Sequence, residues 1–255
     1  MDIAGLSPFE LTYALIVVFL AAIIRRYTGF GFSALVVLGL SLWLTPAEVV
    51  PMVLLLEIVA STHMLPSVWR HIDWYRLGWL LLGSAFSIPL GVYLLASLPE
   101  TEMRILISTL ILAASILIGL GFSIRDGNGR GWILTAGAVS STMTGAAATG
   151  GLAVVVFFLS TSLNPAVSRA TLVALFLATD IYSASLAGSH GLVAVDTFVR
   201  GGIFLIPLFI GISLGSRQFG RSRVSSLRRF TLTLLIVLSV LGLLRATYLS
   251  LIHIS

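Results

Sequence analysis

Apolar residues alternate with short polar stretches along the whole chain, and this pattern predicts ten hydrophobic helices. The expected segments are residues 9–24, 31–44, 48–66, 75–97, 104–122, 131–145, 150–162, 166–187, 197–216 and 230–251. A helix that crosses the hydrocarbon core of a bilayer needs about 20 residues. Six of the segments approach that length, whereas the first, second, sixth and seventh are shorter. The pattern therefore predicts an all-α polytopic membrane protein.

The four shorter segments form two adjacent pairs, and each pair is joined by a glycine-rich turn. The first turn is TGFGFS at residues 28–33, and the second is TGAAATGG at residues 144–151. Non-helical backbone persists at membrane depth only where protein or a watery cavity satisfies its N–H and C=O groups. We expect each pair to fold back as a short helical hairpin, which leaves six full spans and two hairpins. A full crossing by the short segments is the alternative.

The second half of the chain repeats the plan of the first half. A shift of 119 residues places Gly31 on Gly150 and the tripeptide LTP at 44–46 on LNP at 163–165. The predicted repeats cover residues 9–122 and 131–251 of one integral membrane domain, residues 1–255. Because each repeat holds five segments, an odd number, the two halves must enter the membrane in opposite orientations. Inverted repeats of this kind are common in secondary transporters.

The composition agrees with this class and excludes several others. Charged residues make up 10% of the chain and hydrophobic residues 58%, whereas a soluble domain has roughly 25% charged residues. The chain has no cysteine, so it can form neither a disulfide nor a thiolate metal site. We expect no metal and no other cofactor, because nothing resembles a phosphate-binding loop, a zinc motif or a heme ligand pair. The sequence offers no plausible pair of nucleophile and base, so we do not expect an enzyme.

The basic residues are best explained as markers of membrane topology. All fifteen are arginines, set against ten acids, and they do not cluster on a soluble face, so we expect no nucleic-acid partner. If the segments alternate sides from an outer N-terminus, twelve of the fifteen arginines lie in cytoplasmic loops. Arg104, Arg200 and Arg245 are then the exceptions. The positive-inside rule therefore predicts that both termini lie outside.

The two glycine-rich turns are candidate sites for an anion. Glycine permits close backbone approach, and a helix that starts after each turn directs free N–H groups at it. An arginine at the first turn suits an oxyanion, and Arg26 is preferred to Arg25 because it lies nearer the turn. Close helix packing by these glycines is the alternative. The candidate substrate-binding residues are Arg26, Thr28, Gly29, Gly31, Ser33, Thr144, Gly145, Thr149, Gly150 and Gly151.

Two acids lie well inside long apolar segments. Glu57 occurs in VLLLEIVAS and Asp180 in LFLATDIYS, and His63 follows Glu57 by six residues. Ionisable side chains inside a membrane protein are costly, and they usually serve ion or proton movement. We therefore treat Glu57, Asp180 and His63 as candidates for proton coupling. The alternatives are a structural ion pair for the acids and an interfacial position for His63.

Several motifs resemble the sulfite exporter TauE/SafE family, which is also described as the toluene-sulfonate uptake permease family. They are RRYTGFGFSALVV, LTPAEVVPMVLLLEIVAS and IDW in the first half, and TGAAATGGLAVVVFFL and LNPAVSRATLVALF in the second. The resemblance covers about residues 10–245. It implies secondary transport of a sulfur-containing or other organic anion across the bacterial inner membrane, linked to protons. The first turn, TGFG, is poorer in glycine than is usual in the family.

The sequence therefore favours a secondary transporter that moves a small anion by alternating access of its two halves. An anion channel that uses the same turns as a filter is the alternative. Protons, the lipid bilayer and a small anionic substrate are the expected partners. Self-association into a homo-oligomer, the cargo and the direction of transport stay open.

Overall fold

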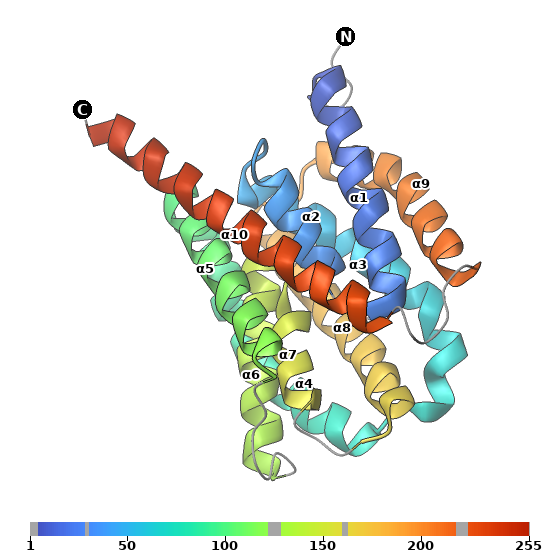
Figure 1. Cartoon of the computed structure of the whole chain (residues 1–255). Helices are drawn as coiled ribbons and strands as arrows, with labels where there is room; N and C mark the ends of the chain where they lie inside the picture. The colour runs from blue at the N-terminus through green and yellow to red at the C-terminus, as the bar shows by residue number, and fades with distance from the viewer. Residues whose placement is uncertain (1–4, 29–30, 122–128, 160–162, 218–223, 255) are drawn as a thin grey trace.

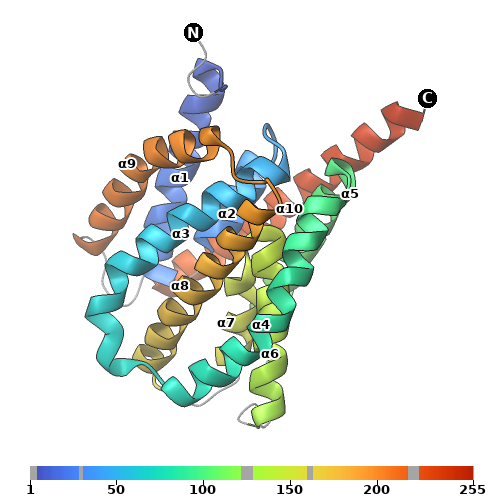
Figure 2. The same cartoon turned by 180° about the vertical axis from the view of Figure 1, so that it is seen from behind.

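The computed structural model describes residues 5–28, 31–121, 129–159, 163–217 and 224–254, which form a bundle of helices (Figures 1 and 2). The helices are α1 (Pro8–Thr28), α2 (Phe32–Leu40), α3 (Pro46–Val68), α4 (Trp74–Ser97), α5 (Glu100–Gly119), α6 (Arg130–Ala147), α7 (Gly150–Leu159), α8 (Pro165–Ser189), α9 (Val195–Arg217) and α10 (Val224–Ile254), with a 3-10 turn, η1, at Trp69–His71. Among the described residues, seven helices are long and apolar enough to cross a membrane: α1, α3, α4, α5, α8, α9 and α10. The prediction of an all-α polytopic membrane protein is confirmed.

The lengths of the short segments differ from those expected. The first predicted segment, 9–24, is part of a helix of 21 residues that continues to Thr28 and is long enough to cross a membrane. In contrast, α2 has 9 residues and α7 has 10. At 1.5 Å per residue each of them extends only about 15 Å, half of the hydrocarbon core. The helices of the second and seventh segments are therefore too short to cross a membrane.

The helices that follow the two short ones begin with matching sequence signals. Thr45 and Glu48 form a capping box at the start of α3, in which Thr45 N–H donates to Glu48 Oε2 at 3.2 Å. At the start of α8, Asn164 Oδ1 accepts from Ala166 N–H at 2.9 Å. A proline follows each cap at the first helical position, where its missing N–H has no cost. The equivalent tripeptides LTP and LNP are thus equivalent helix starts.

Most of the long helices pack in pairs that join distant parts of the chain. α3 packs against α8, α1 packs against α9, α4 packs against α6, and α5 packs against α10. The two short helices lie inside this arrangement, and every residue of α2 is buried. The start of α1 and the end of α10 lie at the same end of the molecule in both views (Figures 1 and 2).

Glycines bring the backbones of α4 and α6 into direct contact. A Cβ atom added at Gly91 would lie 2.3 Å from the carbonyl oxygen of Thr142, and one added at Gly137 would lie 2.3 Å from that of Leu80. Gly145 faces Ile88 in the same way, at 2.6 Å. Small residues at such positions let membrane helices approach closely. This contact therefore depends on the absence of side chains.

We expect Gly91→Ala to lower the free energy of unfolding by about 1–3 kcal/mol, because the new methyl group would overlap backbone atoms of α6. Gly78→Ala on the same helix is the matched control, since nothing lies within 4 Å of its added Cβ. The control should be neutral or stabilising by up to about 1 kcal/mol, as alanine favours a helix over glycine. Thermal unfolding in detergent measures both. Equal effects would argue against a tight α4–α6 contact.

Candidate functional site

The last position of the first glycine-rich turn before α2 has a backbone conformation that favours glycine. Gly31 is the N-cap of α2 and has φ +88°, in the left-handed region that a side chain disfavours. The cap makes no side-chain hydrogen bond to the helix. The first N–H groups of a helix have no partner within it, so those of Phe32 and Ser33 need acceptors elsewhere. The start of α2 is thus a set of hydrogen-bond donors inside the protein.

The second turn closes more tightly. Ala148 has φ +53°, and the N–H groups of Ala148 and Thr149 return to the carbonyls of Thr144 and Met143 at 2.8 and 3.3 Å. This left-handed ending satisfies carbonyls of α6. The chain then enters α7 at Gly150, whose carbonyl accepts from Ser140 Oγ at 2.9 Å. The N-terminus of α7 therefore faces back toward α6.

Both turns line one small buried cavity. Its open volume is about 10 Å³, roughly the space that one water molecule needs. Residues from α1, α2, α3, α6, α7 and α8 contribute to its wall. They are Arg25, Gly31, Ser33, Glu57, Thr144, Ala148, Gly150, Gly151, Phe176 and Asp180. Two helix N-termini, which carry partial positive charge, thus open onto the same space as an arginine and two carboxyls.

Arg25 provides the positive charge of the cavity. Its guanidinium forms an ion pair with Glu57, and its Nη2 donates to Ser61 Oγ at 3.3 Å. The guanidinium also lies 5.7 Å from the centre of the Phe32 ring. Both charged side chains are buried, with 6% and 7% of their surface exposed. A charge in such a place needs a specific partner, and α3 supplies one to α1.

Asp180 brings a second carboxyl from α8 to the same cavity. It is 4% exposed, and its Oδ2 has no hydrogen-bond partner among the described residues. The packing of α3 against α8 thus places Glu57 and Asp180, 123 residues apart in the chain, on one wall. With every group ionised, the three side chains carry one positive and two negative charges.

Five of the predicted substrate-binding residues line the cavity: Gly31, Ser33, Thr144, Gly150 and Gly151. Thr149 lies between them in the chain, 1% exposed, with its hydroxyl unpartnered among the described residues. Gly145 lies instead in the α4–α6 contact, so its position agrees with the packing alternative. Gly29 and the side chains of Arg26 and Thr28 lie outside the described residues.

His63, a predicted coupling residue, is away from the cavity. Its side chain is exposed on α3, and its ring contacts Phe209 of α9 edge to face, with 5.9 Å between the ring centres. It therefore shares no contact with Glu57 or Asp180, the other two coupling candidates, among the interactions of the described residues. An interfacial position, the alternative weighed from sequence, agrees with this placement.

The sequence pattern favours Arg26 over Arg25 as the ligand, and it gives no role to Ser61 or Phe176. A usable signal existed for Arg25, because Val18 and Ala22 precede it by seven and three residues and both are fully buried. Positions spaced three, four or seven residues apart share one face of a helix. Extending α1 past residue 24 would have placed Arg25 on its buried face. Ser61, which accepts from Arg25, and Phe176, which lines the cavity, had no comparable signal, since only tertiary packing brings them to their partners.

Comparison with known proteins adds one finding. A family model described as Sulfite exporter TauE/SafE matches residues 14–241. Searches of curated proteins and of solved structures each found no match. The matched range runs from α1 into α10 and includes both glycine-rich turns and every residue that lines the cavity.

Proposed function

Because the chain belongs to the sulfite exporter TauE/SafE family, whose members are membrane transporters of sulfur-containing anions and not enzymes, we propose that it carries a small oxyanion, such as sulfite or a sulfonate, together with a proton. The proposed binding site is the cavity between the two glycine-rich turns. One observation carries this proposal. Two helix N-termini and the buried side chain of Arg25 meet at a single cavity.

The donors at this cavity suit an anion with several oxygens. The starts of α2 and α7 offer backbone N–H groups whose partial positive charge favours a negative ligand. Arg25 adds a planar guanidinium that can donate to two oxygens at once. Ser33 and Thr144 also line the cavity. Thr144 Oγ1 already donates to the Ser140 carbonyl at 3.1 Å, so the Ser33 hydroxyl is the further donor that we propose for the anion. In this proposal the anion competes with Glu57 for Arg25.

The charge balance of the cavity supports coupling to protons. If Arg25, Glu57 and Asp180 are all ionised, the empty site is already negative by one charge and repels an anion. A proton on Asp180 removes that charge, so an anion binds better when a proton is present. By linkage, the anion then raises the affinity for the proton by the same factor. Such mutual enhancement is the requirement for symport.

The packing of the helices supports two inverted repeats that move against each other. Suppose that α1 to α5 are equivalent, in order, to α6 to α10. The α1–α9 contact is then equivalent to the α6–α4 contact, and the α2–α10 contact is equivalent to the α7–α5 contact; all four contacts are present. The α3–α8 and α5–α10 contacts each join a helix to its own equivalent in the other repeat. In this proposal α1–α2 and α6–α7 are the two hairpins, and rocking of one repeat against the other exposes the cavity alternately.

The size of the cavity supports a carrier rather than a channel. A sulfite ion has four heavy atoms, whereas the cavity has room for about one water molecule. The anion therefore enters only if the turns move away from α3 and α8. A channel needs a path that is open across the membrane. We propose that the described arrangement is a closed state between the two open ones.

The arginine distribution and the positions of the two termini support one orientation in the membrane. When the segments alternate from an outer N-terminus, twelve of the fifteen arginines fall on one side, and eleven do so if Arg25, which lines the buried cavity, is left out. The start of α1 and the end of α10 lie at one end of the molecule, which agrees with termini on a common side (Figure 1). Arginine-rich loops face the cytoplasm. We propose that this multi-pass protein lies in the bacterial inner membrane with both termini outside.

Uptake of radiolabelled sulfite into proteoliposomes tests the proposal, and Asp180→Asn tests the role of the proton. We expect the wild-type protein to accumulate sulfite against its gradient when the lumen is made more alkaline than the bath. Asp180→Asn should lose accumulation driven by the pH gradient, because an amide carries no exchangeable charge. It should keep exchange of labelled for unlabelled sulfite, because the amide resembles the protonated acid.

Asp196→Asn is the matched control, since Asp196 is exposed in the first turn of α9. We expect it to transport like the wild type. Accumulation that ignores the pH gradient in the wild type would rule out proton coupling. Flux that only ever dissipates a gradient and grows linearly with sulfite concentration would point to the channel.

A further inference from the structure

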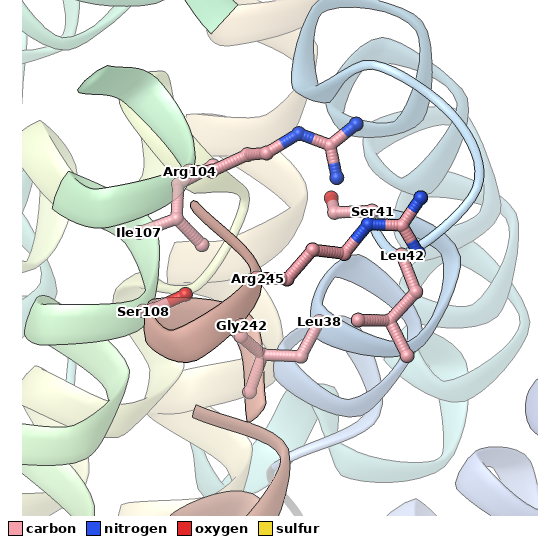
Figure 3. Close-up of a pocket in the computed structure, with 8 residues that line it drawn as sticks. All are labelled: Leu38, Ser41, Leu42, Arg104, Ile107, Ser108, Gly242 and Arg245. Carbon is pink, nitrogen blue, oxygen red and sulfur yellow. The ribbon is translucent and has the colours of Figure 1, made fainter. Parts of the chain in front are cut away.

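A separate, basic pocket lies at the opposite end of α2 from the cavity, near the end of the molecule where α10 ends. It is formed where α2, α5 and α10 meet, and its wall contains two arginines and two serines (Figure 3). The residues are Leu38, Ser41, Leu42, Arg104, Ile107, Ser108, Gly242 and Arg245. Arg104 and Arg245 are two of the three arginines that the proposed topology places outside. The positive-inside rule does not explain two arginines on the outer side, so we looked for a ligand that these arginines could bind.

The two arginines differ in how they are held. Arg104 is buried, and its guanidinium binds the Glu100 carboxylate and the carbonyl of Leu44, the latter at 3.0 Å. Its charge is therefore neutralised within the protein. Arg245 is exposed, and no carboxylate among the described residues pairs with it. The pocket consequently keeps one net positive charge.

A buried hydroxyl in the same pocket has no partner. Ser41, at the end of α2, is 8% exposed, and its Oγ makes no hydrogen bond to the described residues. Figure 3 shows this oxygen turned toward the guanidinium groups of Arg104 and Arg245. A buried hydroxyl without a partner is costly, so an acceptor supplied by a ligand would stabilise it. Three donors of separate elements thus converge on one point.

Neighbouring aromatic rings place the pocket at the level of the lipid headgroups. The Arg245 guanidinium lies 5.6 Å from the centre of the Trp43 ring. Trp43 is 46% exposed and contacts Phe9 and Tyr13 edge to face, with 5.9 and 6.3 Å between ring centres. Exposed tryptophans next to arginines are typical of the boundary between lipid and water.

An apolar stripe leads from the pocket along the outer face of α10. Val237, Leu241 and Leu244 are spaced four and three residues apart, and Arg245 lies four residues after Leu241; the three apolar side chains are 48%, 47% and 61% exposed. Residues three or four positions apart lie on one side of a helix. A charged group above an exposed apolar stripe matches the chemistry of a lipid, with its headgroup at Arg245 and its acyl chain along α10.

We propose that this pocket binds the phosphate of an anionic lipid in the outer leaflet. One phosphate oxygen enters the small space of about 10 Å³, which suits a water-sized group, and accepts from Ser41 and Arg104. Arg245 neutralises the phosphate charge from the exposed side. The lipid thereby ties α2 to α5 and α10. Basic pockets between membrane helices bind headgroups by the same electrostatic attraction.

Thermal unfolding of the full-length protein, titrated with dioleoylphosphatidylglycerol in zwitterionic micelles, tests the site. A ligand that binds only the folded state raises the unfolding midpoint as its concentration rises. We expect Arg245→Gln to weaken the apparent affinity about ten-fold, because a charge-assisted hydrogen bond is lost. Ser41→Ala should weaken it about three-fold while leaving every charge in place. Lipid-induced shifts are compared, so a change in basal stability does not obscure the result.

Arg130→Gln is the matched control. Arg130 is also exposed and lies 5.8 Å from the centre of a tryptophan ring, that of Trp79, but it is outside this pocket. We expect its lipid affinity to equal that of the wild type. Equal losses in Arg130→Gln and Arg245→Gln, an equal response to dioleoylphosphatidylcholine, or no response to Ser41→Ala would each overturn the site. If inorganic phosphate alone gave the same Arg245-dependent shift, the ligand would be a free oxyanion and the lipid assignment would be wrong.

Discussion

Replacing Arg25 with glutamine is expected to abolish sulfite transport and to lower the free energy of unfolding by about 3–5 kcal/mol. The loss of stability follows because Glu57 would keep its charge in a buried site without its partner. The loss of transport follows because the guanidinium is the only full positive charge among the residues that line the cavity. Proteoliposome uptake and thermal unfolding measure the two effects separately.

The double variant Arg25→Gln with Glu57→Gln separates folding from binding. It removes both members of the ion pair and leaves two amides that can hydrogen-bond to each other. Replacing a whole buried pair is often nearly neutral for stability, whereas removing one partner is not. We therefore expect the double variant to recover most of the lost stability and none of the transport. Recovered transport would show that Arg25 serves the fold alone.

Arg130→Gln is the control for this experiment also, because Arg130 is exposed at the start of α6. It should transport sulfite at the wild-type rate. Retained transport in the single variant Arg25→Gln would remove Arg25 from the binding site. The anion would then need another cationic ligand, for which Arg26, whose side chain lies outside the described residues, is the sequence-based candidate.

Gly150→Ala is expected to abolish transport and to destabilise the protein by about 3 kcal/mol, the upper end of the range for an overpacked site. An added Cβ would lie 2.0 Å from Thr144 Oγ1 and 2.2 Å from the carbonyl oxygen of Ser140. The threonine side chain can rotate away, but the carbonyl belongs to the backbone of α6. The methyl group must therefore push α7 out of its place and remove its N–H groups from the cavity.

Gly131→Ala is the control in the same hairpin, since nothing lies within 4 Å of its added Cβ. It should keep full transport and gain up to about 1 kcal/mol from helix propensity. Uptake in proteoliposomes and unfolding in detergent are again the measurements. Wild-type behaviour of Gly150→Ala would mean that the second turn is looser than described and that α7 does not supply ligands to the anion.

The sequence alone determined those features that depend on near neighbours in the chain. Apolar runs identified each of the ten α-helices that the structure describes, because each helix must cover its backbone with apolar side chains inside a bilayer. The tripeptides LTP and LNP marked equivalent places in the two halves, and the structure shows that Thr45 and Asn164 cap helices there, since a cap acts on residues two or three positions away. Glycine at positions 31 and 150 located the turns for the same local reason. The motifs within these segments also carried the resemblance to the family.

Only the tertiary structure decided which side chains meet. Helical periodicity gives a residue its face, but it does not say which helix that face contacts. Arg25 pairs with Glu57, and Gly145 contacts the backbone of α4, only because distant segments pack together. Segment lengths were also decided there, since the ends of α2 and α7 depend on the helices around them. The basic pocket at Arg245 joins three elements that no sequence pattern connects, because a contact between distant residues is a property of the fold.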